Sequence, residues 1–173
     1  AIQGGIIFAC IAAYFYLKKH QIPVLPFADT VTPGIILGQA IGRIANFMNG
    51  DAFGHPTGQD FGLLYPDTTL AYHTYGAQPL WPAEVWECQG DLLIFVLLLW
   101  YGCKTRAEGT TFCLYIMFYS LLRFFLENYR GDYGTLALGL KSAQLTSLAA
   151  FAGAFILFLY FHFKYKSKSG ISE

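Results

Sequence analysis

The chain has 173 residues, of which 55% are hydrophobic and 18% aromatic, whereas only 13% are charged. That charged share is about half of the share usual in a soluble domain, so the composition excludes an ordinary soluble globule. The eleven basic residues are balanced by eleven acidic ones, so net charge gives no indication of a nucleic-acid partner. A chain of this length accommodates one membrane domain of a few spans, and we treat residues 1–173 as that single domain.

Several apolar segments approach the length of about 20 residues that an α-helix needs to cross a bilayer. Five such segments cover residues 1–17, 29–49, 83–101, 110–128 and 141–163. We therefore expect an all-α, polytopic integral membrane protein in which residues 50–82 form an arm outside the membrane. The four cysteines show no C-x-x-C spacing and lie in or beside apolar runs, so we expect them to act as small hydrophobic residues.

The distribution of basic residues predicts the orientation of the chain. Seven of them follow the first, third and fifth expected spans: Lys18, Lys19, Lys104, Arg106, Lys164, Lys166 and Lys168. Only Arg130 and Lys141 fall on the opposite side, while Arg43 and Arg123 lie inside spans. Because cytoplasmic loops carry the excess of Lys and Arg, we expect the C-terminus in the cytoplasm and the arm on the outer side. The first apolar run lacks a basic leading region, so no cleavable signal peptide is expected.

The arm interleaves aromatic residues with prolines. The aromatic residues are Tyr65, Tyr72, Tyr75 and Trp81, and the prolines are Pro66, Pro79 and Pro82. One interpretation is an aromatic belt at the membrane interface, and the other is a lid that rests over a site. His55 and His73 also lie in the arm, either as solvated side chains or as proton carriers.

The second expected span combines small residues with polar ones. Gly34, Gly38 and Gly42 recur at a spacing of four, a pattern that lets another helix approach closely. Arg43 follows directly, and Asn46 lies three residues later on the same helical face. Further polar residues, Asn49 and Asp51, lie a turn beyond, near the expected outer surface.

The fourth expected span carries a polar stripe. Tyr119, Arg123 and Glu127 are spaced by four, which places them along one side of a helix. An arginine at the bilayer centre costs about 2.5–3.5 kcal/mol on insertion scales, so each one needs a partner. Glu127 is available to Arg123 one turn away, whereas Arg43 has no acidic residue nearby in its own span before Asp51.

Two acidic residues, Glu84 and Glu87, open the third expected span on one face. They are candidates for the partner of Arg43, for a proton acceptor, or for ordinary interfacial carboxylates. The intramembrane charges then admit two interpretations. They are either salt bridges that join helices, or a receptor for an anion such as a lipid phosphate, which a guanidinium binds as a bidentate fork. The sequence has no metal-ligand spacing and no phosphate-binding glycine loop, so we predict neither a metal nor a cofactor.

The stretch GRIANFMNGDAFG, residues 42–54, resembles the signature of the bacterial prolipoprotein diacylglyceryl transferase family. The matching residues are Gly42, Arg43, Ala45, Asn46, Phe47, Asn49 and Gly54, and Asp51 stands where the family usually has Glu. Shorter resemblances follow in the family's order in QGGIIFA, PAEVWE, YSLLRFFLE and AQLTSL, where Gln3 replaces the family's His. The resemblance runs from end to end of the chain. It implies a fold of seven spans, of which this chain is expected to begin at the third, without the functional Tyr of the earlier part.

The resemblance also implies an activity. The family transfers the diacylglyceryl group of phosphatidylglycerol to the lipobox cysteine thiol of a prolipoprotein, forms a thioether and releases glycerol 1-phosphate. The expected location is the bacterial cytoplasmic (inner) membrane, with the active site toward the outer leaflet. The expected partners are phosphatidylglycerol, the prolipoprotein signal peptide and membrane lipids, with no nucleic acid.

The residues that match the family are the candidate site. The expected catalytic residues are Arg43, Arg123, Glu127, Tyr119 and Glu87. The expected headgroup-binding residues are Arg43, Asn46, Asn49, Asp51, Gly54, Arg123 and Gln3. In this interpretation the two arginines clamp the phosphate, Glu127 and Tyr119 hold Arg123 in its rotamer, and Gly54 allows close backbone approach.

The replacement at Gln3 leaves the catalytic base open, because an amide cannot accept the thiol proton. Glu87, His55 and His73 are the alternatives, and a further one is that the arginine field alone suffices. Two other functions also stay open at this stage. In the first, the chain is a diverged paralogue that acts on another thiol or lipid. In the second, it is a non-catalytic phospholipid-binding or assembly subunit.

Overall fold

The computed structural model describes residues 2–104, 107–131 and 141–169, without the side chains of residues 2, 3, 6, 168 and 169. These residues form helices and loops, with isolated β-bridges but no extended strand among them. The elements in chain order are α1 (Ile2–Lys19), α2 (Val24–Asn49), α3 (Leu70–Tyr75), α4 (Ala83–Gly102), α5 (Thr110–Leu126), a 3₁₀ turn (Glu127–Tyr129) and α6 (Ser142–Ser169).

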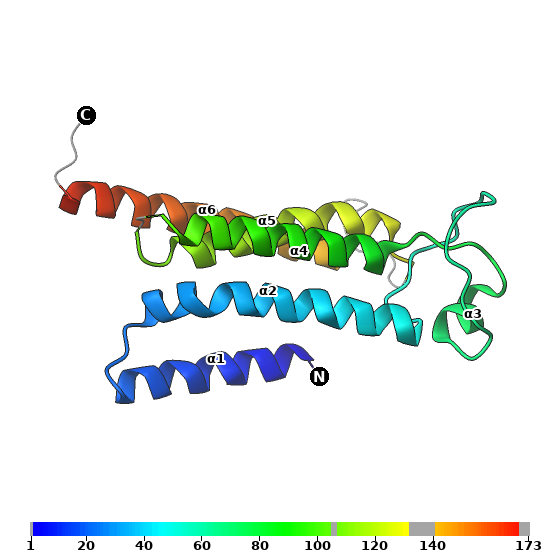
Figure 1. Cartoon of the computed structure of the whole chain (residues 1–173), viewed down its shortest axis with the longest axis horizontal. Helices are drawn as coiled ribbons and strands as arrows, with labels where there is room; N and C mark the ends of the chain where they lie inside the picture. The colour runs from blue at the N-terminus through cyan, green and yellow to red at the C-terminus, as the bar shows by residue number, and fades with distance from the viewer. Residues whose placement is uncertain (1, 105–106, 132–140, 170–173) are drawn as a thin grey trace.

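The long helices run side by side along the longest axis of the molecule (Figure 1). α4 packs against α2 and α5, α6 packs against α5, and α1 contacts α2. Ile36 of α2 and two residues of α4, Ile94 and Leu98, form the buried core. Partly buried apolar residues of α5, including Leu114 and Phe118, close this core.

Many large apolar side chains point outward from these helices. Leu93 and Trp100 of α4 are 61% and 62% exposed, and Ile156 of α6 is 66% exposed. Such a surface suits lipid rather than water. The segments Val24–Asn49, Thr110–Tyr129 and Ser142–Ser167 are long and apolar enough to cross a membrane. The expected all-α membrane fold is confirmed, while the count of five spans stays a prediction.

Two helices, α2 and α6, extend more than one helical turn beyond their expected bounds. α2 begins at Val24 rather than near residue 29, because Pro23 lies at its N-cap and Pro26 in its first turn, where a missing N–H is tolerated. α6 continues to Ser169 rather than residue 163. Lysine is a good helix former, and its long side chain reaches polar surroundings, so the basic end of α6 stays helical.

The glycines of α2 do not pack as expected. A Cβ atom added at Gly34, Gly38 or Gly42 would have no neighbour within 4 Å in the described structure. Close approach occurs instead at Gly90 of α4, where a Cβ would lie 2.5 Å from the Leu122 side chain of α5. In the described structure no helix packs closely on the glycine face of α2, and the tight contact between α4 and α5 lies at a lone glycine.

The arm, residues 50–82, lies at one end of the helices, which we call the arm end (Figure 1). Its small core consists of Phe53, Ala71 and Leu80. The arm folds back over the end of α5: the His55 N–H donates to the Tyr129 carbonyl at 2.9 Å, and the Tyr75 hydroxyl donates to the Gly131 carbonyl at 3.0 Å. These contacts favour the interpretation of the arm as a cover over that end.

The arm begins at a tight turn that requires glycine. Gly50 caps the C-terminus of α2 with φ 67°, a left-handed conformation that side chains disfavour. The opposite end of the helices, where Gly102 ends α4 and Thr110 begins α5, we call the turn end.

Candidate functional site

One carboxylate, that of Glu87, lies at the centre of the polar residues at the arm end. Its side chain is fully buried on the first turns of α4. Its Oε1 lies 2.7 Å from Nη2 of Arg43 on α2, and its Oε2 lies 3.2 Å from Nη1 of Arg123 on α5. A third guanidinium, that of Arg130, approaches Oε2 at 3.4 Å. Glu87 is therefore the acidic partner that Arg43 lacks in its own helix.

A second carboxylate, that of Glu127, extends the arrangement. Its Oε2 lies 2.8 Å from Nη2 of Arg123, one helical turn away. The Lys141 ammonium lies 4.0 Å from the other Glu127 oxygen and donates to the backbone carbonyls of Glu127 and Arg130 at 2.8 and 2.6 Å. We call these side chains the arginine cluster: Arg43, Glu87, Arg123, Glu127, Arg130 and Lys141.

The arginine cluster brings several cationic side chains together around the carboxylates of Glu87 and Glu127. Asp91, one turn further along α4, is fully buried and interacts electrostatically with Arg43 and Arg123. Neither of its carboxyl oxygens has a hydrogen-bond partner among the described residues. Asp91 is thus a further acid beside the two guanidiniums, and the fork-shaped donors of those guanidiniums suit an added anion.

The arginines are also accessible, whereas the acids are not. The side chains of Arg43 and Arg123 are 20% and 16% exposed, while those of Glu87 and Glu127 are 0% exposed. A guanidinium has five N–H donors, and Arg43 uses one of them in a hydrogen bond to a described residue. The buried acids thus hold the guanidiniums in place from behind, while donors remain for a ligand in front.

Tyr119 supports this arrangement through a different partner than expected. Its hydroxyl donates to Oε1 of Glu87 at 3.4 Å. No hydrogen bond joins its hydroxyl to Arg123 in the described structure, although both residues lie on α5. In the described structure the hydrogen bond of Tyr119 therefore reaches Glu87, and the ion pairs with Glu87 and Glu127 are the direct contacts that hold the Arg123 guanidinium.

The other residues of the signature lie around the arginine cluster rather than in it. Asn46 is half-buried one turn beyond Arg43, and Asn49 and Asp51 are exposed. In the described structure none of these three side chains contacts a cluster residue through a hydrogen bond. Gly54 is a site of close approach: a Cβ there would lie 2.2 Å from the Trp81 carbonyl oxygen. Its role is therefore packing within the arm.

Of the candidate proton acceptors, Glu87 belongs to the arginine cluster, whereas the others lie outside it. Glu84 accepts a hydrogen bond from the Tyr65 hydroxyl of the arm. His55 places Nδ1 2.9 Å from the Pro56 carbonyl oxygen, which makes Nδ1 the donor and leaves Nε2 as an acceptor. His73 is exposed on α3. The Gln3 side chain lies outside the described residues.

Sequence reasoning missed two members of the arginine cluster. From the sequence, Arg130 and Lys141 were interpreted only as basic residues on the outer side of the membrane. Arg130 reaches Glu87 because the chain after α5 pairs with the arm, in a bridge between Gly54 and Arg130. The available signal was that these are the only two basic residues outside spans on that side. Asp91, four residues after Glu87, was also missed.

Comparison with known proteins gives this site a context. Residues 1–160 match the family described as prolipoprotein diacylglyceryl transferase. The chain is 38% identical over 174 aligned residues to the phosphatidylglycerol–prolipoprotein diacylglyceryl transferase of Clostridioides difficile (strain 630), an alignment that covers 100% of this chain and 64% of that protein. The protein of the same name from Corynebacterium efficiens is 35% identical over 170 residues, covering 91% of this chain and 52% of that protein.

A third relative, from Clostridium botulinum (strain Hall), carries the same name and is 38% identical over 149 residues, or 86% of this chain and 58% of its own length. The chain thus spans 52–64% of the length of these curated relatives. The match covers all the elements that build the arginine cluster, and the chain belongs to the prolipoprotein diacylglyceryl transferase family.

Proposed function

We propose that this chain transfers the diacylglyceryl group of phosphatidylglycerol to the lipobox cysteine of a prolipoprotein. One observation carries the proposal: Arg43 and Arg123, from two different helices, converge on the buried Glu87 carboxylate with donors to spare. The printed names of the relatives, which specify both phosphatidylglycerol and prolipoprotein, support the same reaction.

The first task of the site is to bind a phosphate. A phosphodiester carries one negative charge and presents oxygens that match the guanidinium fork. Arg43 and Arg123 bind these oxygens from the exposed side, and Glu87 and Glu127 fix their orientation from the buried side. Asn46, Asn49 and Asp51 lie toward the arm, where they meet the hydroxyl groups of the glycerol headgroup.

The second task is the substitution itself. The cysteine sulfur forms a bond to the glyceryl carbon that carries the phosphate, and the carbon–oxygen bond to phosphate breaks with its electron pair leaving on oxygen. Glycerol 1-phosphate is released, and the thiol proton is lost. Because charge grows on the leaving phosphate, preorganised cations stabilise the transition state more than the ground state.

The thiol proton leaves without a carboxylate base in this scheme. Both oxygens of Glu87 already accept hydrogen bonds from guanidiniums, so Glu87 is a poor acceptor. The partly exposed guanidiniums of Arg43 and Arg123 favour the thiolate, as neighbouring cations do for reactive cysteines. The proton passes to water at the arm end.

The proposed reaction also predicts the membrane in which the chain lies and its orientation there. The chain lies in the bacterial cytoplasmic (inner) membrane, with the arm end at the outer leaflet and the C-terminus in the cytoplasm. The excess of basic residues at the turn end supports this orientation. The lipid substrate then reaches the arginine cluster from within the outer leaflet.

A second candidate function is supported by Gln3, which stands where the family has His. In that case the chain binds phosphatidylglycerol but transfers nothing, or acts on another thiol or lipid.

The test is a transfer assay with purified protein, phosphatidylglycerol and a lipobox peptide that contains cysteine, read by mass spectrometry. We expect a mass increase of one diacylglyceryl group on the peptide, no increase on a Cys→Ser control peptide, and none with Arg43→Lys protein. A protein that copurifies with phosphatidylglycerol but never modifies the peptide supports the binding function instead.

A further inference from the structure

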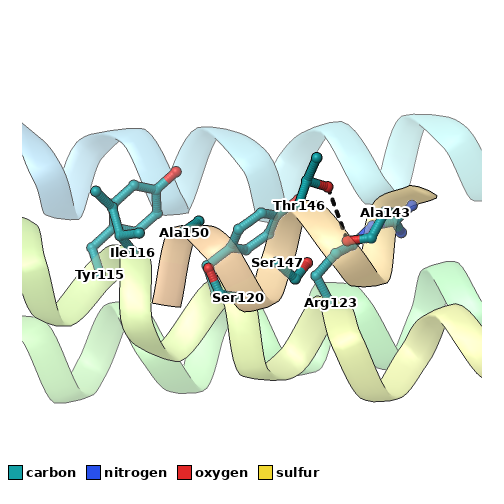
Figure 2. Close-up of a pocket in the computed structure, with 9 residues that line it drawn as sticks. Tyr115, Ile116, Ser120, Arg123, Ala143, Thr146, Ser147 and Ala150 are labelled. Atoms are coloured by element: carbon teal, nitrogen blue, oxygen red, sulfur yellow. Dashed lines mark hydrogen bonds between the residues drawn. The ribbon is translucent and has the colours of Figure 1, made fainter. Parts of the chain in front are cut away.

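A groove between α5 and α6 opens beside the arginine cluster. Its cavity volume is about 290 Å³. Figure 2 shows Tyr115, Ile116, Ser120 and Arg123 of α5 along one side, with small residues of α6 such as Ala143, Ser147 and Ala150 along the other. Because these side chains are small, the groove between the two helices stays open. Arg123 belongs to both the groove and the arginine cluster.

The length of the groove matches one leaflet of a bilayer. Arg123 lies at its arm end and Tyr115 lies eight residues earlier on the same helix. At about 1.5 Å per residue these positions are about 12 Å apart along α5. The hydrocarbon core of a bilayer is about 30 Å thick, so one leaflet contributes about 15 Å of it. A chain that starts at Arg123 and follows the groove therefore extends through most of that depth.

The surface of the groove is mostly apolar, although small hydroxyl residues such as Ser120 and Ser147 also line it. The Thr146 hydroxyl donates to the backbone carbonyls of Ser142 and Ala143 within its own helix, both at 3.0 Å. The Tyr115 hydroxyl donates to Oε1 of Gln39 on α2 at 3.0 Å. Arg123 is the charged residue in the groove lining. This arrangement fits a ligand with an anionic head and a hydrocarbon tail.

We infer that the groove between α5 and α6 seats one acyl chain of the phospholipid whose phosphate meets Arg123. The inference rests on the proposed function and adds the position of the lipid tail. A peptide helix has a diameter of at least about 10 Å, which is much wider than a single hydrocarbon chain, and the groove between two packed helices suits the narrower ligand. The occupant is therefore a single hydrocarbon chain rather than a signal-peptide helix.

The test uses a matched pair of variants on α6. Ala149 and Ala150 are neighbouring, exposed alanines of the same helix, but only Ala150 lines the groove. Ala150→Phe fills the groove, and Ala149→Phe adds the same ring to the lipid-facing surface. The probe is phosphatidylglycerol with a photoreactive diazirine in one acyl chain, added to the full chain in lipid nanodiscs.

We expect the probe to label peptides of α5 and α6 that line the groove, with labelling about tenfold lower in Ala150→Phe, which corresponds to about 1.4 kcal/mol of lost binding. Ala149→Phe should label like the unmodified chain. Equal labelling of all three proteins, or labelling confined to other helices, overturns the inference. Because labelling needs no transfer, an inactive protein that still labels the groove contradicts the proposed function but leaves the acyl-chain seat standing.

A second measurement distinguishes an effect on binding of the acyl chain from an effect on binding of the phosphate headgroup. With active protein, Ala150→Phe should raise the KM for phosphatidylglycerol with sixteen-carbon chains by about tenfold. The KM for a lipid with six-carbon chains should change by less than about twofold, since a short chain barely enters the groove. If a lipobox peptide rather than the lipid protects the groove from labelling, the peptide is the occupant and the inference is wrong.

Discussion

Two acidic residues at opposite ends of the same helices show how a buried carboxylate can serve different purposes. At the turn end, Asp29 of α2 is 6% exposed and accepts hydrogen bonds from the backbone N–H groups of Gly109 and Phe112, at 2.8 and 2.9 Å. At the arm end, Glu87 is fully buried and meets the side chains of Arg43, Arg123 and Arg130.

The partners make the difference. Asp29 occupies the N-terminus of α5, where unpaired N–H groups and the helix dipole stabilise an anion. Those donors are fixed backbone groups with nothing left for a ligand. The partners of Glu87 are side-chain cations, each with further donors and two of them partly exposed. One acid therefore joins two helices, and the other prepares a binding site.

The largest effect should come from Glu87→Gln. Removing the carboxylate leaves three guanidiniums close together without their shared anion, and breaking a buried pair in this way costs about 3–5 kcal/mol. We expect a strongly lowered melting temperature and loss of phosphatidylglycerol binding, measured by thermal unfolding in detergent and by lipid copurification.

The matched control for Glu87→Gln is Asp67→Asn, which removes an exposed acid of the arm. It should change neither measurement. If Glu87→Gln melts and binds lipid like the unmodified chain, Glu87 does not organise the arginine cluster.

A smaller effect on stability alone should follow from Asp29→Asn. The amide keeps one acceptor oxygen but loses the charge at the helix N-terminus, so we expect a loss of about 1–2 kcal/mol. Lipid binding per folded molecule should stay within about twofold of the unmodified chain, because a change of 0.4 kcal/mol or less leaves the site intact. If Asp29→Asn lost as much lipid binding as Glu87→Gln, the claim that only the arm end prepares a binding site would be wrong.

The smallest effect should come from Tyr119→Phe. The hydroxyl contributes one long hydrogen bond to Glu87, and a neutral hydrogen bond is worth about 0.5–1.5 kcal/mol. We expect transfer activity or lipid affinity to fall by about twofold to tenfold. The control is Tyr101→Phe, which removes a hydrogen bond to Thr110 at the turn end instead and should leave the lipid affinity unchanged. Equal losses in both variants would show that Tyr119 has no special relation to Glu87.

The sequence was sufficient for the class of fold and for most of the arginine cluster. The apolar runs predicted long helices, and all of them form. The pairs at a spacing of four, such as Arg123 with Glu127, could be foreseen because a helix places such residues on one face. The candidate role of Glu87 as the partner of Arg43 also came from the simple requirement that a charge inside a membrane needs a counter-ion.

The remaining features depend on contacts between distant parts of the chain. Arg130 reaches Glu87, 43 residues earlier in the chain, only through the packing of the arm on the end of α5. Asp29 accepts a hydrogen bond from the backbone N–H of Gly109, the N-cap of α5, which lies 80 residues later in the chain. Helical periodicity reports which face a residue lies on but not which helix packs there, so the tight contact at Gly90 could not be foreseen from the sequence. The groove, likewise, appears only when α5 and α6 are placed together.

The most direct test of the central claim is a double-mutant cycle with Arg43→Lys, Arg123→Lys and the double variant, measured as affinity for phosphatidylglycerol in nanodiscs. If the two guanidiniums share one carboxylate and one phosphate, either single substitution should lose nearly as much affinity as both together, with a coupling free energy above about 1 kcal/mol. Losses that add to within about 0.3–0.5 kcal/mol would show that Arg43 and Arg123 act independently, and would contradict the account.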